Sequence, residues 1–419
     1  MSLPTYPAYK DSDVAWLGEV PEHWGIRRIK YLFEIKKRIA GTDGYDVLSI
    51  TQQGIKVKDI DSGDGQLSMD YSKYQLVEVG DFAMNHMDLL TGYVDISHIP
   101  GVTSPDYRVF AVRDNGVCFD RYYLYLFQVG YRNKIFYAFG QGSSQLGRWR
   151  FPTDQFNSFH FPHPSILEQK EIANFLDRET TKIDELIAEQ QRLIKLLKEK
   201  RQAVISHAVT KGLNPDAPMK DSGIEWLGEV PEHWEIKPLK IVVSMKSGEQ
   251  ITAEDIGEEG IYPVFGGNGL RGYTSNFTHE GYFPLIGRQG ALCGNINYGK
   301  GKFWASEHAV VASPLLECSI LWLGEILRTM KLGQYSITAA QPGLSVEAIG
   351  NLRIPFPPLF EQSVVATFLD RETTKIDELI AEAQRAIELL KERRAALISA
   401  AVTGKIDVRG LVADKLAVE

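Results

Sequence analysis

Hydrophobic residues recur at three-and-four spacing through two long segments of the chain, with Lys, Arg, Glu and Gln between them. This pattern predicts two amphipathic helices, each with one apolar face. The positions on these faces are Ile183, Leu186, Ile187, Gln190, Leu193, Ile194, Leu197, Val204, Ile205 and Ala208 in the first helix, and Ile376, Leu379, Ile380, Ala383, Ala386, Ile387, Leu390, Leu397, Ile398 and Ala401 in the second. Each predicted helix opens with Glu-Thr-Thr, at 179–181 and 372–374, and ends near a glycine, Gly212 or Gly404. Shorter helices are predicted before them, at 168–177 and 361–370.

The length of these helices indicates how they pack. Residues 181–210 would form a helix of about 45 Å. A narrow apolar stripe of this length needs another helix along it, so we predict that the two segments pair as an intramolecular antiparallel coiled coil. The alternative is that each helix packs only on the globular part of the chain that precedes it.

The chain repeats itself in alternate parts. Asp11–Trp24 (DSDVAWLGEVPEHW) and Asp221–Trp234 (DSGIEWLGEVPEHW) agree at 11 of 14 positions, and Phe175–Glu189 is identical to Phe368–Glu382. The blocks between these repeats show little similarity to each other. The predicted segments are a repeat strip (1–24), a first block (25–164), a helical region (165–212), a second strip (213–234), a second block (235–357), a second helical region (358–404) and a tail (405–419). We therefore predict a pseudo-two-fold internal repeat that carries two different blocks.

The blocks themselves are predicted to be mixed α/β with much strand. Residues 45–57, 261–273 and 282–298 alternate aromatic or β-branched residues with glycine turns, whereas 121–136 and 323–332 have helical patterns. Each block closes on a proline-rich exit, HFPHPSILEQ or RIPFPPLFEQ. The predicted fold class is thus two globular α/β domains separated by two long paired helices.

Composition narrows the class of protein. The chain has 44% hydrophobic and 24% charged residues, without an apolar run long enough for a membrane span or a signal-peptide pattern at its start. Its three cysteines lack CxxC spacing, which favours a reducing, cytoplasmic location over a disulfide framework or a zinc site. The net charge of −8 arises largely in the strips, so both blocks are near neutral and can carry locally basic faces.

Catalytic signatures are absent from the sequence. It contains no GxxxxGK[ST], HExxH or GxSxG motif, and Phe139–Gly142 lacks the Asn-Pro-Pro-Tyr or Asp-Pro-Pro-Tyr element of AdoMet-dependent methyltransferases. We assign His23 and His233, and the tryptophans of the strips, a structural role, with a partner surface as the alternative for the tryptophans. A chain with two large, dissimilar blocks and no recognisable reaction centre or metal site is predicted to be a binding protein.

Candidate binding residues lie in turns rich in Gly, Arg and Gln. Arg and Gln can form paired hydrogen bonds with guanine and adenine edges, and glycine lets the backbone approach phosphates. The candidates are Lys36, Lys37, Arg38, Gln145, Arg148 and Arg150 in the first block, and Gly267, Asn268, Gly269, Arg271, Arg288, Gln289 and Gln341 in the second. Ordinary turn structure and solvated surface charge are the alternatives.

At this point the combined pattern resembles the specificity (S) subunits of type I restriction–modification systems. The resemblance rests on WLGEVPEHW, on FLDRETTKIDELI and on TAAQPGLSVEAIGNLRIPFPPL, and it covers essentially the whole chain. The first block departs from it, with QGSSQLGRWR where the family's commoner form is QPGL. The resemblance implies a non-catalytic subunit whose two target-recognition domains each read half of a bipartite sequence in double-stranded DNA.

The same resemblance implies partners and cofactors outside this chain. Two methyltransferase (M) subunits would bind AdoMet and methylate adenine N6, and restriction (R) subunits would bind ATP and Mg²⁺. The paired helices would then act as a ruler, so that shortening both by one turn changes the spacer between the half-sites and leaves the half-sites unchanged. Two other classes compete with this hypothesis. A stand-alone modification enzyme would bind AdoMet itself, and a scaffold unrelated to DNA would show no salt-dependent binding to it.

Overall fold

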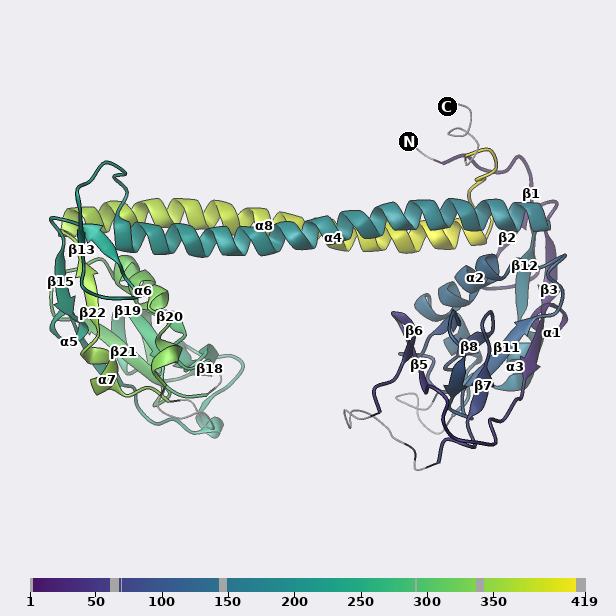
Figure 1. Ribbon diagram of the computed structural model, residues 1–419, viewed down its shortest axis with the longest axis horizontal. Helices are drawn as coiled ribbons and strands as arrows, with labels where there is room; N and C mark the ends of the chain where they lie inside the picture. Colours follow the sequence, from purple (N-terminus) through teal and green to yellow (C-terminus); the bar gives the residue numbers. More distant parts are fainter. Residues whose placement is uncertain are drawn as a thin grey trace. The chain divides into compact units, whose positions relative to one another are not determined.

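The repeated segments fold into the same framework around two different sheets. The computed structural model describes residues 3–60, 68, 70–142, 149–290, 292–336 and 343–411. It divides into unit 1, Met1–Glu189 with Ala386–Glu419, and unit 2, Gln190–Arg385. The helices α4, Ile166–Lys211, and α8, Leu359–Val402, each contribute a segment to both units (Figure 1). The segment boundaries predicted above stay predictions.

Unit 1 is built on a four-stranded antiparallel sheet with the order β4-β11-β8-β9. Its core is aromatic, and the rings of Phe33, Phe82, Phe110 and Phe127 contact one another with centroids 5.1–5.9 Å apart, mostly edge to face or tilted. The elements before α4 are β1 Tyr9–Asp11, β2 Glu19–Pro21, β3 Gly25–Arg28, α1 Ile29–Leu32, β4 Phe33–Lys36, β5 Leu48–Thr51, β6 Gly54–Val57, β7 Gln75–Val77, β8 Phe82–Met84, β9 Val94–Ile96, β10 Gly101–Thr103, β11 Arg108–Val112, α2 Asp120–Arg132, η1 Phe136–Phe139, α3 Thr153–Ser158 and β12 His160–His163.

Unit 2 is built on a six-stranded sheet with the order β16-β21-β19-β20-β17-β18, antiparallel except where β17 pairs with β20. Its main core is largely aliphatic, and Ile286, Val310, Leu323 and Ile326 are buried in it beside Trp322. The elements between α4 and α8 are β13 Met219–Asp221, β14 Glu229–Pro231, β15 Glu235–Pro238, α5 Leu239–Val242, β16 Val243–Ser247, η2 Ala253–Asp255, β17 Tyr262–Gly266, β18 Gly269–Thr274, β19 His279–Gly287, β20 Ile296–Ala305, β21 Ala309–Pro314, α6 Ile320–Thr329, η3 Leu332–Tyr335, α7 Val346–Gly350 and β22 Arg353–Phe356.

The framework common to the two units lies at the start and the end of each block. The strip hairpin is β1–β2 in unit 1 and β13–β14 in unit 2, and the strand that follows it pairs with the last strand of the block, β3 with β12 and β15 with β22. The strands between differ in number and order. The repeat therefore fixes how a block is attached, whereas the middle of each block is free to vary.

Each long helix is continuous, so the prediction of separate short helices at 168–177 and 361–370 is wrong. The predicted helix starts at Thr180 and Thr373 are interior positions. Their hydroxyls donate to the carbonyl oxygens of Leu176 and Leu369, both at 2.7 Å, and thus find partners inside the helix rather than acting as caps. The predicted ends are confirmed, because Gly212 and Gly404 adopt φ of +77° and +74° just after the last turns.

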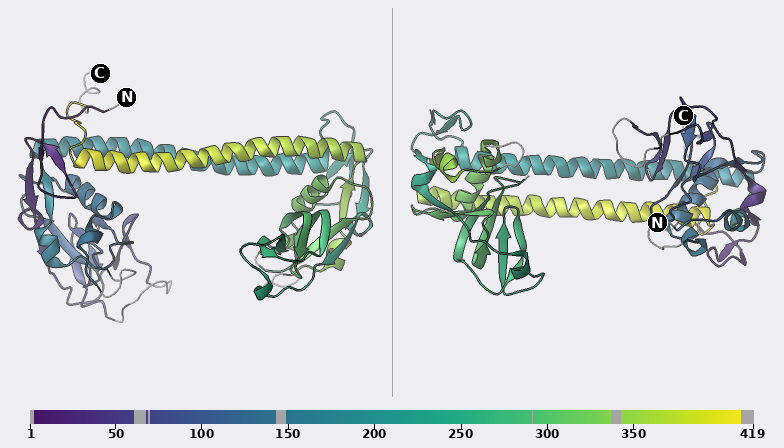
Figure 2. Two further views of the ribbon diagram at one scale, coloured as in Figure 1. Left: turned by 180° about the vertical axis from the view of Figure 1, so that it is seen from behind. Right: turned by 90° about the horizontal axis from the view of Figure 1, so that it is seen from below.

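The α4 and α8 segments run alongside each other in opposite directions within each unit (Figure 2). In unit 1, Arg394 Nε lies 2.9 Å from Asp184 Oδ1, and in unit 2 Arg201 Nε lies 3.0 Å from Asp377 Oδ1. The repeat exchanges these pairs, since Asp184 corresponds to Asp377 and Arg201 to Arg394. The predicted intramolecular antiparallel pairing is confirmed.

The contact stripe between the helices is narrower than the sequence predicted. Ile183, Leu197, Ile376, Ala383 and Ile387 are buried. Other members of the predicted apolar faces are exposed, namely Leu186, Leu193 and Leu379. Two helices cover only a narrow seam of each other, so positions at the edge of a wider apolar face stay in contact with solvent.

The strips bind the first turn of each long helix. Trp24 and Trp234 are fully buried, and their indole Nε1 groups donate to Glu168 at 3.0 Å and to Glu361 at 2.9 Å. The next residue of each helix, Gln169 or Gln362, binds the block through a side-chain oxygen that accepts from the backbone N–H of Phe119 or Ser319. The structural role predicted for the strip tryptophans is thus confirmed at 24 and 234. No helix in the described part of the chain is long and apolar enough to cross a membrane.

Candidate DNA interface

Two glycine-rich turns of unit 2 lie against each other. One joins β17 to β18 at Gly267 and Asn268, and the other follows β19 at Arg288–Gly290. A Cβ on Gly287 would lie 2.2 Å from the carbonyl oxygen of Gly267, which is closer than any side chain tolerates. Glycine at 287 therefore lets the two turns approach.

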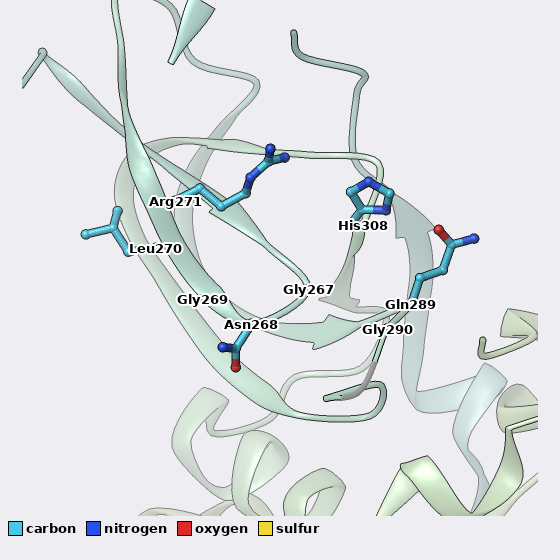
Figure 3. Close-up of a pocket in the computed structure, with 8 residues that line it drawn as sticks. All are labelled: Gly267, Asn268, Gly269, Leu270, Arg271, Gln289, Gly290 and His308. Atoms are coloured by element: carbon cyan, nitrogen blue, oxygen red, sulfur yellow. The ribbon is translucent and has the colours of Figure 1, made fainter. Parts of the chain in front are cut away.

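A hollow of about 530 Å³ lies between these turns (Figure 3). The side chains of Arg271 and Gln289 are exposed, and neither makes a hydrogen bond to another described residue. A Cβ on Gly266 would lie 2.4 Å from Cδ of Arg271, so the arginine stem lies directly on the backbone of this glycine. The lining residues are Gly267, Asn268, Gly269, Leu270, Arg271, Gln289, Gly290 and His308. The hollow thus presents free Arg and Gln groups of the kind that pair with base edges.

The structure brings most of the candidates of the second block together. Gly267, Asn268, Gly269, Arg271 and Gln289 line one hollow, although they come from two separate turns. That they contact DNA stays a prediction.

Two further candidates lie beside the hollow or beyond the described chain. Arg288 is half-buried, and its guanidinium donates to Ser247 Oγ at 3.1 Å while its backbone N–H donates to the His308 carbonyl oxygen at 2.9 Å. Gln341 falls outside the described residues, and the nearby Gly343 forms a backbone bridge with Gln289.

Sequence reasoning missed His308 and the exposed Leu270 in the lining of this hollow. His308 precedes β21, which is distant in sequence from both turns, and no motif marks it. Leu270 lies between the candidates Gly269 and Arg271. An aliphatic side chain in an otherwise polar turn was the signal that could have marked it.

The basic cluster predicted at 36–38 is largely neutralised within unit 1. Lys36 Nζ lies 2.6 Å from Glu34 Oε2, and the Arg38 guanidinium forms ion pairs with Glu78 and Asp81. Lys37 is exposed and makes no ion pair with another described residue. Binding of DNA by these residues stays a prediction, with Lys37 as the member whose charge is free.

The remaining candidates of the first block lie on the segment before α3. Arg150 is exposed and pairs with Gln141 through two backbone hydrogen bonds of 2.9 and 3.0 Å. Gln145 and Arg148 fall outside the described residues. The described residues on either side of them are joined by the Gln141–Arg150 bridge.

Unit 1 also has a polar hollow of about 700 Å³ that the sequence did not indicate. Tyr71 and Tyr74 meet edge to face at 4.9 Å beside it, and Asn85 and Asp88 contribute amide and carboxylate groups. The pattern Tyr-x-x-Tyr was the available signal. Among the described residues, no group of three or more His, Cys, Asp or Glu side chains is placed to hold a metal ion.

His86 lies between Asn85 and Met87, two residues that line this hollow, and it is half-buried. Burial, reinforced by the charges of Arg108 and Arg150, lowers the pKa of His86 to about 3. Its Nδ1 atom is buried and makes no hydrogen bond. The imidazole is therefore neutral in the folded chain throughout the mildly acidic range.

This shift predicts an acid sensitivity of unit 1. Between pH 6.5 and about 3 the unfolded chain takes up a proton at His86 that the folded chain does not, so the free energy of unfolding decreases as the pH decreases. The loss at pH 5 relative to pH 7.5 is about 2 kcal/mol. Urea denaturation at pH 5 and at pH 7.5 measures the difference in the free energy of unfolding. In His86→Gln this difference should be smaller than in the wild type by about 2 kcal/mol. An unchanged pH dependence in the variant would contradict the assignment.

Comparison with known families decides which protein class this framework represents. The model of the type I restriction modification DNA specificity domain matches residues 21–196 and 231–389, one match for each half of the repeat. The chain belongs to the type I restriction–modification DNA specificity family. The resemblance noted in the sequence is confirmed.

Individual relatives agree with this assignment. The chain is 44% identical to the EcoprrI specificity subunit of Escherichia coli over 142 residues, 33% of this chain and 35% of that subunit. It is 22% identical to the putative MjaX specificity subunit of Methanocaldococcus jannaschii over 443 residues, 94% of this chain and 96% of that protein. The chain spans about a third of the EcoprrI subunit and 64% of the MjaVIII subunit in these matches.

Solved structures confirm the fold class. A chain from a study of complex assembly and conformational transition in a type I R-M system aligns with a TM-score of 0.70 at 14% identity, covering 91% of this chain and 98% of that one. The HsdS subunit from Thermoanaerobacter tengcongensis aligns with a TM-score of 0.55 at 14% identity, covering 92% and 98%. This member of the specificity family therefore has the predicted mixed α/β architecture with an internal repeat.

Proposed function

We propose that this chain is the sequence-reading subunit of a type I restriction–modification complex, and that each block reads one half of a bipartite, asymmetric site in double-stranded DNA. One observation carries the proposal. Each half of the chain matches the specificity family, and the two halves hold different sheets on the same repeated framework. Different sheets present different side chains, so each half would read a different sequence. The hollow between the two turns of unit 2 is the proposed reading surface there.

The chemistry of the complex is assigned to its other subunits. The chain acts as a non-catalytic subunit, with AdoMet held by two methyltransferase subunits and ATP with Mg²⁺ held by restriction subunits. Adenine N6 is methylated after the base rotates out of the duplex into the methyltransferase subunit, because its target atom is not accessible inside the stack. DNA in the bacterial or archaeal cytoplasm is the expected substrate.

Arg271 and Gln289 test the reading surface. Replacing Arg271 with alanine is expected to reduce affinity for the cognate site about tenfold to hundredfold, the effect of one paired contact with a base edge, and to relax the sequence at one position. Gln289→Ala should relax another position of the same half-site. Sequencing of methylated adenines, together with fluorescence anisotropy on randomised targets, measures both effects.

Lys195 on α4 provides a charge-matched control, because it is an exposed cation on the helix rather than in the hollow. Lys195→Ala should leave both half-site sequences unchanged. Should Arg271→Ala weaken binding equally on every sequence, the arginine would contact phosphate only, and the hollow would not be a reading surface.

A further inference from the structure

The space between each strip and the first turn of its long helix is called the seat here. In unit 1 the side chain of Tyr6 fills it. The carboxylate of Glu168 accepts from the Trp24 indole, lies 3.0 Å from His23 Nε2, and also accepts from the Tyr6 hydroxyl at 2.8 Å. Only 5% of the Glu168 side chain is exposed. Burial, followed by the charge of Glu168, raises the pKa of the Tyr6 phenol, which keeps it protonated as a donor.

The seat of unit 2 has the same Trp, His and Glu residues but no tyrosine. Glu361 accepts from the Trp234 indole at 2.9 Å and lies 2.6 Å from His233 Nε2, as in unit 1. No other described side chain donates to its carboxylate, and 35% of the Glu361 side chain is exposed. The repeated strips align Tyr6 with Asp216, which cannot replace a phenol. The carboxylate in unit 2 therefore has room for a further donor.

Tyr6 is held in its seat by contacts that unit 2 does not repeat. Pro4 accepts a backbone hydrogen bond from Asp407 at 2.8 Å, and the Arg409 guanidinium lies 4.8 Å from the centre of the Tyr6 ring. In unit 2 a single segment, residues 212–218, both follows α4 and leads into the strip, so it takes the place of the two segments that meet at Tyr6 in unit 1. Leu213, Asn214 and Ala217 of this segment line the space beside Glu361.

An apolar groove of about 220 Å³ lies beside Glu361. Phe360 is 78% exposed and Val364 is 41% exposed, one turn apart on α8. The repeat places Leu167 and Glu171 at these positions in unit 1, so the paired apolar surface is specific to unit 2. The groove is lined by Lys211, Gly212, Leu213, Asn214, Ala217, Pro231, His233, Phe360, Glu361, Val364 and Val365. It combines exposed apolar side chains with one open carboxylate.

We propose that this groove is a docking site for a tyrosine-bearing segment of the methyltransferase subunit. The ring would pack on Phe360 and Val364, and the hydroxyl would donate to Glu361 as Tyr6 donates to Glu168. The proposal rests on the proposed function, which supplies the partner. An aromatic hydroxyl fits because the other half of the same chain places one against the equivalent carboxylate.

The test uses the full-length chain and the purified methyltransferase subunit of the same system. The variant Phe360→Asp/Val364→Glu removes the apolar surface, and its second change introduces the residue found at the equivalent position of unit 1. It is expected to weaken binding of one of the two methyltransferase subunits at least tenfold in sedimentation-velocity titrations, because the groove lies in unit 2 alone. Leu167→Asp is the matched control, because Leu167 is 71% exposed at the equivalent position, and it should change that affinity less than twofold.

A photo-crosslinking residue in place of Phe360 identifies the occupant. An adduct on a tyrosine-bearing segment of the methyltransferase subunit supports the proposal, whereas an adduct on a second copy of this chain overturns it. Unchanged affinity of the double variant also overturns it. If the unmodified chain bound neither the methyltransferase subunit nor specific DNA, the proposed function itself would fail, which is a separate and recognisable outcome.

Discussion

Replacing Trp24 with alanine is expected to lower the free energy of unfolding of unit 1 by about 3–5 kcal/mol. The indole is fully buried, and its loss would leave a cavity beside the last turn of α8. The ring lies so close to Gly404 that a Cβ on this glycine would be 3.1 Å from it. The substitution also removes the donor to Glu168, a buried carboxylate that is costly to leave with fewer partners. Differential scanning calorimetry should show the transition of unit 1 at a lower temperature.

Trp234→Ala provides the comparison, since Trp234 holds the same place in unit 2. It should destabilise unit 2 and leave the transition of unit 1 in place. Trp24→Phe keeps part of the ring volume and loses the bond to Glu168, so its effect should lie between those of the wild type and the alanine variant. A loss below 1 kcal/mol for Trp24→Ala would show that the strip is not what anchors the first turn of α4.

The parts of this fold that follow from local pattern were predicted from the sequence. Two identical 15-residue stretches with the same apolar spacing predicted helices that pair, and the ion pairs Asp184–Arg394 and Asp377–Arg201 confirm the pairing. The glycines at 212 and 404 marked the helix ends because a left-handed residue is needed there. The starts were misplaced because threonine reads as a capping residue, although Thr180 and Thr373 bind carbonyl oxygens within the helix.

The candidate site depends on contacts between distant segments, which limited what the sequence could show. Arg38 read as part of a basic patch, but Asp81, 43 residues later, neutralises it. Gly267 and Gln289 were chosen from separate turns, and only the folded sheet places them in one hollow with His308. Local composition thus selected residue types suited to DNA, whereas their neighbours were set by the order of the strands.

Shortening α4 and α8 by seven residues each is expected to change the DNA spacer and leave both half-site sequences unchanged. At 1.5 Å per residue, seven residues remove about 10 Å of helix, which corresponds to about 3 base pairs. Seven residues suit this test better than one turn, because two turns of helix nearly restore the phase of the apolar seam, within about 20°. The wild-type site should then lose methylation, and a site with a spacer shorter by about 3 base pairs should gain it.

The two reciprocal ion pairs define where the deletions belong. A deletion of residues 187–193 lies between Asp184 and Arg201, and the matched deletion of residues 380–386 lies between Asp377 and Arg394. Both pairs then shift by the same number of residues, so each arginine can still meet its aspartate. Deleting residues 187–193 alone is the control, because it puts the two pairs out of register and should destabilise the helices without creating a new spacer. Sequencing of methylated adenines reads the spacer and the half-sites together, and a changed half-site with an unchanged spacer would show that helix length does not set the spacing.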